Sequence, residues 1–97
     1  MIRHVVMFKL KPGVSEAQRD EWLRMSRRLH AEIDLVRAFS IGEDLLRLPR
    51  SYDVAVVADF DDLEDVRAYA DHPTHLATVA LSRELSEHIV SVDFEIW

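Results

Sequence analysis

Two predicted strands that are apolar on both faces constrain this fold more than any other feature. Residues Ile2–Leu10 and Tyr52–Phe60 have the two-residue period of a strand, yet both of their faces are largely apolar. A strand with one face in water would alternate apolar and polar residues more cleanly. Both faces of the sheet therefore need a cover, and a chain of 97 residues has few elements to supply it.

Helical segments between the strands supply the first cover. Ser15 and Gln18 have the spacing of a capping box, which predicts the start of a helix. The apolar stripe that follows at helical spacing consists of Trp22, Met25, Leu29 and Ile33. A second helical region begins after Asp61 and Asp62. Pro73 divides it, because proline cannot continue one helix but suits the first turn of the next.

The two pieces of this second region differ in character. In the first piece the expected inner stripe is Leu63, Val66 and Ala70, with Tyr69 at its edge. The second piece runs from Pro73 to about Glu87 and carries a broad apolar surface, made of Leu76, Val79, Ala80, Leu81 and Leu85.

Two further extended runs, Val36–Leu45 and Ile89–Trp97, complete the pattern. In the last run the apolar face consists of Val90, Val92, Phe94 and Ile96, and the polar face of Ser91, Asp93 and Glu95. The order β-α-β-β-α-β predicts an α+β, ferredoxin-like domain over residues 1–97, with a four-stranded antiparallel sheet. Its helices cover one face only. The economical second cover is another copy of the same sheet, so we expect a homodimer.

Composition excludes several classes of protein. The net charge of −6 would repel a phosphate backbone, so nucleic acid is not an expected partner. The chain has no cysteine, which removes disulfides, thiolate catalysis and cysteine-based metal sites. No apolar run reaches the roughly 20 residues that span a bilayer, and the N-terminus lacks a signal-peptide pattern. We therefore expect a cytoplasmic protein without a membrane partner.

Reactive side chains concentrate in Tyr69–His75, which holds a phenol, a carboxylate and two imidazoles around Pro73. A histidine in the first turn of a helix is kept neutral by the helix dipole, so His75 could act as a base with Tyr69 as a hydrogen-bond donor. The segment could instead be a plain helix junction whose polar side chains cap amides. A metal on His72 and His75 is a further alternative. Its third ligand would be His4, Asp71 or Asp93, and no sequence rule selects among them.

The chain resembles the stress-responsive dimeric α/β-barrel (Dabb) family over essentially its whole length. The motifs that carry the resemblance are Ile2–Lys11, Pro49–Asp53, Tyr69–His75 and Val92–Phe94. The resemblance implies a dimeric barrel but no single reaction. A plant polyketide cyclase of this family closes its product by an aldol condensation without metal or cofactor. Similarity to it implies that His75 is the general base, Tyr69 the orienting phenol and His4 a pocket histidine, while Val54 stands where that enzyme has a further histidine.

These arguments predict one site and leave three functions open. His75 and Tyr69 are the candidate catalytic residues, and the candidate ligand-binding residues are His4, Val6, Phe8, Val54, Leu76 and Val79. We expect neither a metal nor a cofactor. The chain could be a dimer that binds a small, partly apolar molecule. It could also be a cofactor-independent cyclase, lyase or monooxygenase-like enzyme, or a purely structural dimer.

Overall fold

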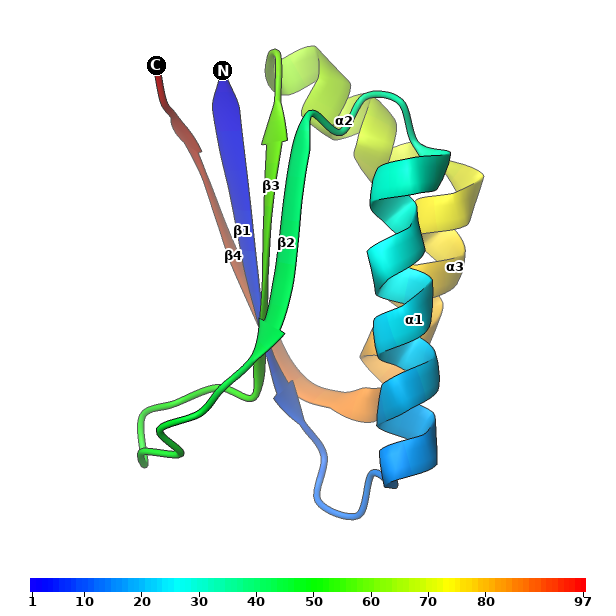
Figure 1. Ribbon diagram of the computed structural model, residues 1–97, viewed down its shortest axis with the longest axis vertical. Helices are drawn as coiled ribbons and strands as arrows, with labels where there is room; N and C mark the ends of the chain where they lie inside the picture. Colours follow the sequence, from blue (N-terminus) through cyan, green and yellow to red (C-terminus); the bar gives the residue numbers. More distant parts are fainter.

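The computed structural model describes residues 1–97 and has the predicted order of elements. Its elements are β1 (Ile2–Leu10), α1 (Glu16–Glu32), β2 (Ala38–Glu43), β3 (Val54–Phe60), α2 (Leu63–Asp71), α3 (Pro73–Leu85) and β4 (Ser86–Glu95). The strands form one antiparallel sheet in the order β2-β3-β1-β4. All three helices lie against the same face of this sheet (Figure 1). The α+β ferredoxin-like prediction is confirmed.

Three strands have boundaries that differ from the predicted ones, and β2 and β4 also end two residues early, at Glu43 and Glu95. β2 begins only at Ala38, because the Val36 amide donates to the carbonyl of Ile33 in the turn that leaves α1. β3 begins at Val54 and not at Tyr52. β4 begins at Ser86, directly after α3, without the connecting residues that the sequence suggested.

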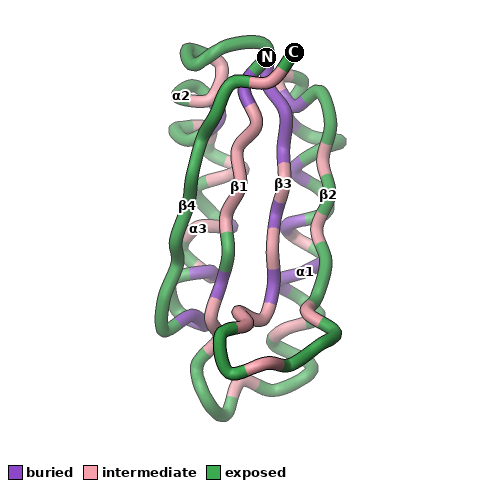
Figure 2. Tube along the Cα trace, turned by 90° about the vertical axis from the view of Figure 1, so that its left-hand side faces the viewer, coloured by how far each residue is buried: buried purple, intermediate pink, exposed green.

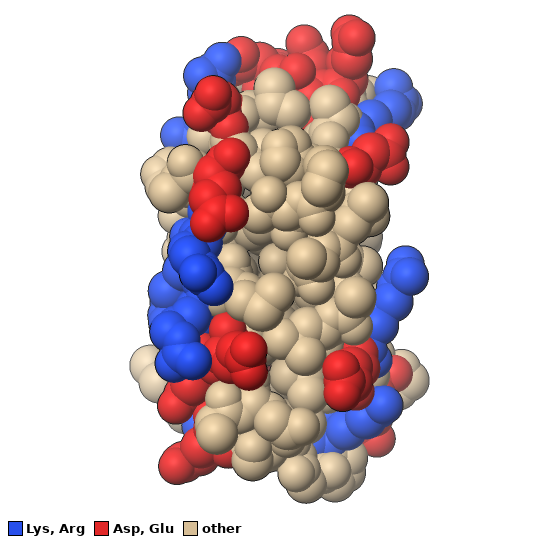
Figure 3. Space-filling view, turned by 90° about the vertical axis from the view of Figure 1, so that its right-hand side faces the viewer, with Lys and Arg blue, Asp and Glu red and all other residues tan.

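The capping box at the start of α1 forms as predicted. The Gln18 amide donates to Ser15 Oγ at 3.1 Å, and the Ser15 amide donates to Gln18 Oε1 at 2.9 Å. The predicted stripe needs one change, because Met25 is only half-buried while the inner face of α1 consists of Trp22, Leu23, Ser26 and Leu29. The Trp22 indole donates to Ser82 Oγ at 2.8 Å and so ties α1 to α3. On the helix side, charged side chains border a strip of uncharged ones (Figure 3).

Two apolar clusters fill the layer between helices and sheet. One cluster consists of Phe8, Trp22, Leu23, Val54, Val56 and Leu85. The other consists of Leu29, Ile33, Val36, Ala58, Phe60 and Tyr69. They lie toward opposite ends of the sheet, since β1 pairs Phe8 with Val54 and Ile2 with Phe60. None of the helices is long and apolar enough to cross a membrane.

The second face of the sheet has no helix over it (Figure 2). The apolar side of β4 lies on this open face, where Val90, Val92 and Phe94 are exposed. Val92 sits opposite Val5, and Val90 opposite the exposed Met7. The polar side of β4 faces the helices instead, which reverses the usual arrangement of a strand in an isolated domain. An apolar face of this kind is typical of an interaction surface.

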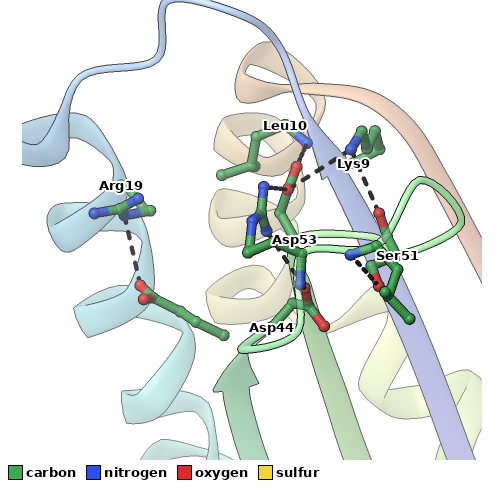
Figure 4. A network of polar contacts seen from close by, with 9 residues as sticks. Lys9, Leu10, Arg19, Asp44, Ser51 and Asp53 are labelled. Atoms are coloured by element: carbon green, nitrogen blue, oxygen red, sulfur yellow. Dashed lines mark hydrogen bonds and ion pairs between the residues drawn. The ribbon is translucent and has the colours of Figure 1, made fainter.

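A buried carboxylate fastens the loop between β2 and β3 to the end of β1 (Figure 4). Asp53, only 14% exposed, accepts the Leu10 amide at 2.7 Å and Arg47 Nη2 at 2.8 Å. Burial alone would raise the pKa of Asp53. The Leu10 amide, the Arg47 guanidinium and nearby Lys9 outweigh it and hold that pKa below its ordinary value.

Replacing this carboxylate should destabilise the fold in a pH-dependent way. We expect Asp53→Asn to lower the free energy of unfolding by about 1–2 kcal/mol at neutral pH. Because the folded-state pKa is depressed, the contribution is present above the unfolded pKa, near 4, and is lost as pH falls through the folded-state value. Urea unfolding of both proteins at several pH values measures this. Asp20→Asn, at an exposed position, is the control. A difference between parent and Asp53→Asn that is independent of pH would contradict the charge argument.

Candidate functional site

A cavity of about 410 Å³ lies between the helices and the covered face of the sheet. Its lining comes from three strands and all three helices, and consists of His4, Val6, Phe8, Ser26, Leu29, Val56, Tyr69, His75, Thr78, Val79, Ser82, Arg83, Ile89 and Ser91. Members of both apolar clusters contribute to it, so the cavity occupies the space between them.

Most of the predicted site residues meet at this cavity. Those that line it are His4, Val6, Phe8, Tyr69, His75 and Val79. Val54 and Leu76 do not line this cavity. Val54 is buried at the Trp22 end of the core, and Val56 takes its expected place on the wall. Leu76 is 51% exposed. The face of α3 that packs against the rest of the domain carries Thr78, Ser82 and Leu85, and Leu76 lies outside this face.

Tyr69 is the buried residue of α2 and not an edge residue. Its side chain is 3% exposed, whereas Leu63 and Ala70 of the predicted stripe are exposed. The phenol ring packs on Phe60, with ring centres 4.9 Å apart. The contact between α2 and the sheet is therefore made mainly by the Tyr69 ring, and not by the predicted stripe of Leu63, Val66 and Ala70.

The junction between α2 and α3 brings Tyr69 and His75 together. His72 ends α2 and also caps α3, where its Nδ1 accepts the Thr74 amide at 3.1 Å. Pro73 occupies the start of α3, as predicted. The change of helix direction places the rings of Tyr69 and His75 side by side, with centres 4.2 Å apart. The segment is therefore a helix junction with a capping side chain, and it also brings Tyr69 and His75 together.

The His75 ring has one nitrogen bonded within the chain and one nitrogen free. Its Nδ1 lies 3.1 Å from the Ala70 carbonyl oxygen, which can only accept, so Nδ1 carries the hydrogen and Nε2 keeps a free lone pair. Burial lowers the pKa of His75, and the positive charges of protonated His4 and His72 would lower it further. The bond to Ala70 offsets part of this effect. The ring is therefore uncharged at neutral pH.

The Tyr69 hydroxyl keeps its hydrogen and has no partner within the chain. Burial raises the pKa of its hydroxyl to about 12, so the phenol stays protonated. No side chain or backbone group of the chain bonds this hydroxyl, and the ring lines the cavity. The hydroxyl is not one of the buried polar atoms that lack a partner, so it is accessible and can bond a polar atom of a ligand in the cavity.

His4 and Asp93 form a second pair at the same end of the cavity. They lie opposite each other on β1 and β4, and His4 Nδ1 is 2.5 Å from Asp93 Oδ1. The carboxylate orients the ring and leaves Nε2 free, with the ring centre 6.2 Å from that of Tyr69. The sequence left the partner of Asp93 open. The strand register could have identified this partner. If the first residues of β1 pair antiparallel with the last residues of β4, His4 lies opposite Asp93.

The remaining polar wall residues are mostly occupied. Ser26 Oγ donates to the Trp22 carbonyl at 2.9 Å, Thr78 Oγ1 to Thr74 at 3.3 Å and Ser82 Oγ to Thr78 at 2.9 Å. No group of three His, Asp or Glu side chains in the chain is arranged to hold a metal ion. His72 and Asp93, two of the candidate ligands, already bond within the chain.

Residues 2–96 match the model of the Stress responsive A/B Barrel Domain family, Dabb. The chain belongs to the Dabb family. This Dabb protein is 35% identical to an uncharacterized protein of Streptomyces coelicolor, over 98% of the chain and 99% of the relative. Olivetolic acid cyclase of Cannabis sativa is 23% identical, over 96% of the chain and 94% of the cyclase. A dimeric ferredoxin-like protein of unknown function from Thermobifida fusca has a TM-score of 0.89 at 34% identity, covering 98% of this chain and 90% of that one.

The protonation state of His75 in this Dabb protein can be measured directly. We expect the His75 ring to titrate below the ordinary histidine pKa of about 6.5, because burial disfavours the imidazolium. Nitrogen-15 NMR should also report hydrogen on Nδ1 and a bare Nε2 at neutral pH. His75→Gln, which lacks the ring, serves to assign the signals. Titration above 6.5, or hydrogen on Nε2, would contradict the geometry described above.

Proposed function

We propose that this Dabb protein binds a small, partly apolar molecule in the cavity between its helices and sheet. The observation that carries the proposal is a pair of free polar groups, the Tyr69 hydroxyl and the His75 Nε2, on the wall of a largely apolar cavity, with their ring centres 4.2 Å apart. Small-molecule sites commonly have volumes of about 300–1,000 Å³, apolar walls and a few convergent polar groups. The unfilled volume of about 410 Å³ argues against a purely structural role.

The second candidate is a cofactor-independent enzyme, because His75 and Tyr69 could perform complementary steps of one reaction. A neutral His75 can remove a proton next to a carbonyl, and the protonated Tyr69 can donate to the enolate oxygen that forms. His4, oriented by Asp93, offers a further proton-transfer group at the same end. The similarity to olivetolic acid cyclase supports chemistry of the aldol type. Val54, buried away from the cavity, supplies no counterpart to a further histidine, so the proposal rests on Tyr69, His75 and His4.

Binding and turnover can be separated with matched variants. A library of poly-β-keto thioesters and small aromatic compounds should give NMR shift changes grouped around the cavity. Val79→Phe, which fills the cavity, should abolish them, while Leu76→Phe on the outer side of the same helix should not. If a compound is turned over, His75→Ala should lower kcat by about 10²-fold or more and Tyr69→Phe by less, with binding retained.

The controls for these variants lie outside the cavity. Tyr52→Phe and His88→Ala change the same residue types at positions that do not line it, and both should behave like the parent. Binding that survives Val79→Phe would refute the binding site. Turnover that survives both His75→Ala and Tyr69→Phe would refute the enzyme proposal and leave the binding proposal standing.

We also propose that two copies pack their open sheet faces together. The open face is apolar along β4 and β1, and the Thermobifida fusca neighbour is described as dimeric. The charged pair on this face is already neutralised, since Arg3 donates twice to Asp59, at 2.8 and 3.0 Å. Covering the face would therefore leave no unpaired charge from that pair.

A charge placed on the open face should break the dimer. We expect the parent to sediment as a dimer at micromolar concentration. Val92→Lys should sediment as a monomer, because burying an unpaired charge in the interface has a large free-energy cost. Leu76→Lys, a change of similar exposure on the helix side, should remain dimeric. A parent protein that is monomeric at this concentration would overturn the dimer without affecting the cavity.

A further inference from the structure

The cavity has two chemically different ends. At one end lie His4, Tyr69 and His75, whose rings contact or approach one another. At the other end lie Phe8, Ile89 and Arg83. Phe8 and Ile89 are cross-strand neighbours on β1 and β4, just as His4 and Asp93 are at the first end. The cavity therefore runs along β1, from the polar ring cluster to the arginine.

Both walls give the same length for this cavity. His4 and Phe8 are four residues apart on β1, which at about 3.3 Å per residue is roughly 13 Å. His75 and Arg83 are eight residues apart on α3, which at 1.5 Å per residue is about 12 Å. The space between the ends is bounded by four apolar side chains, Val6, Leu29, Val56 and Val79, and by the hydroxyl residues Ser26, Thr78, Ser82 and Ser91. Three of these hydroxyls, those of Ser26, Thr78 and Ser82, already donate to backbone carbonyls.

The charge on the wall is entirely basic. The cavity lining contains no Asp or Glu, although the whole chain has 18 acidic residues against 12 Lys and Arg. Arg83 is the only permanently charged residue of the lining. It takes part in none of the ion pairs of the chain, which use Arg3, Arg19, Arg37, Arg47, Lys9 and His4 as their cationic partners. Its guanidinium is therefore free to receive an anion, whose planar oxygen pairs it fits well.

We propose that the ligand is an elongated molecule with an apolar body and an anionic end group, such as a carboxylate, that binds Arg83. Its opposite end carries a hydroxyl or carbonyl oxygen that meets Tyr69 and His75. Arg83 thus selects the substrate class and the orientation in which it enters. This inference rests on the proposed binding function of the cavity. It adds the charge of the ligand to what the volume and the apolar walls already indicate.

A matched pair of probes tests the charge preference. The probes are 10-hydroxydecanoate and its neutral amide, 10-hydroxydecanamide, titrated into the full-length parent protein by calorimetry at low salt. We expect the carboxylate to bind at least 10-fold more tightly than the amide. Arg83→Gln should reduce this ratio to about one by weakening only the carboxylate. Arg83→Lys should retain part of it, because lysine keeps the charge but loses the planar fork.

The controls separate this inference from a role of Arg83 at the end of α3, where a cation also favours the helix dipole. Loss of that role would lower stability and weaken both probes equally. Arg67→Gln, an exposed arginine outside the cavity, should leave the ratio unchanged. Equal binding of the two probes to the parent, or a ratio that survives Arg83→Gln, would overturn the inference while the binding site stands. If the parent binds neither probe, nor any compound of the library, both proposals fall.

Discussion

The sheet of this protein is covered by helices on one side only, and most of its features follow from that. The polar side of β4, with Ser91 and Asp93, lies on the helix side of the sheet, while Val90, Val92 and Phe94 lie on the open side. Every residue of this edge strand after Ser86 is exposed. An isolated domain would gain free energy from the reverse arrangement. An apolar partner on the open face would stabilise the observed arrangement. The arrangement also places hydrogen-bonding groups on the helix side of the sheet, where Ser91 lines the cavity and Asp93 bonds His4.

The junction at Pro73 then decides where those interior groups become useful. A continuous helix would carry Tyr69 and His75 six positions apart, on different faces. His72 makes the break possible because its ring accepts the Thr74 amide that the new helix leaves unpaired. The break turns two separate side chains into a contacting pair, and the same local bonding fixes the tautomer of His75 through the Ala70 carbonyl. Backbone capping and the chemistry of the site therefore depend on the same few residues.

The sequence was informative wherever a local rule applied. The capping box at Ser15, the helix start at Pro73 and the two-sided strands β1 and β3 each follow from spacing alone, and together they define the fold. The site was harder, because its walls depend on how elements rotate against one another. The apolar pattern of α3 predicts Leu76 on the inner face, whereas the buried residues of this helix are Thr78, Ser82 and Leu85. To predict a contact between strands far apart in the sequence, such as that of His4 with Asp93, one needs the strand register as well as the apolar pattern.

The small hydroxyl residues on α3 are also the best physical reason why a cavity exists at all. Protein interiors pack densely, and leucine at position 78 or 82 would occupy part of the unfilled volume. Thr78 and Ser82 instead bond back to the carbonyls one turn earlier, so their own polarity is satisfied and the space beside them stays empty. An unfilled space beside apolar walls costs stability. A chain that retains this space gives up packing that a ligand could restore, and the Tyr69 hydroxyl and the His75 Nε2 on its wall are accessible to that ligand.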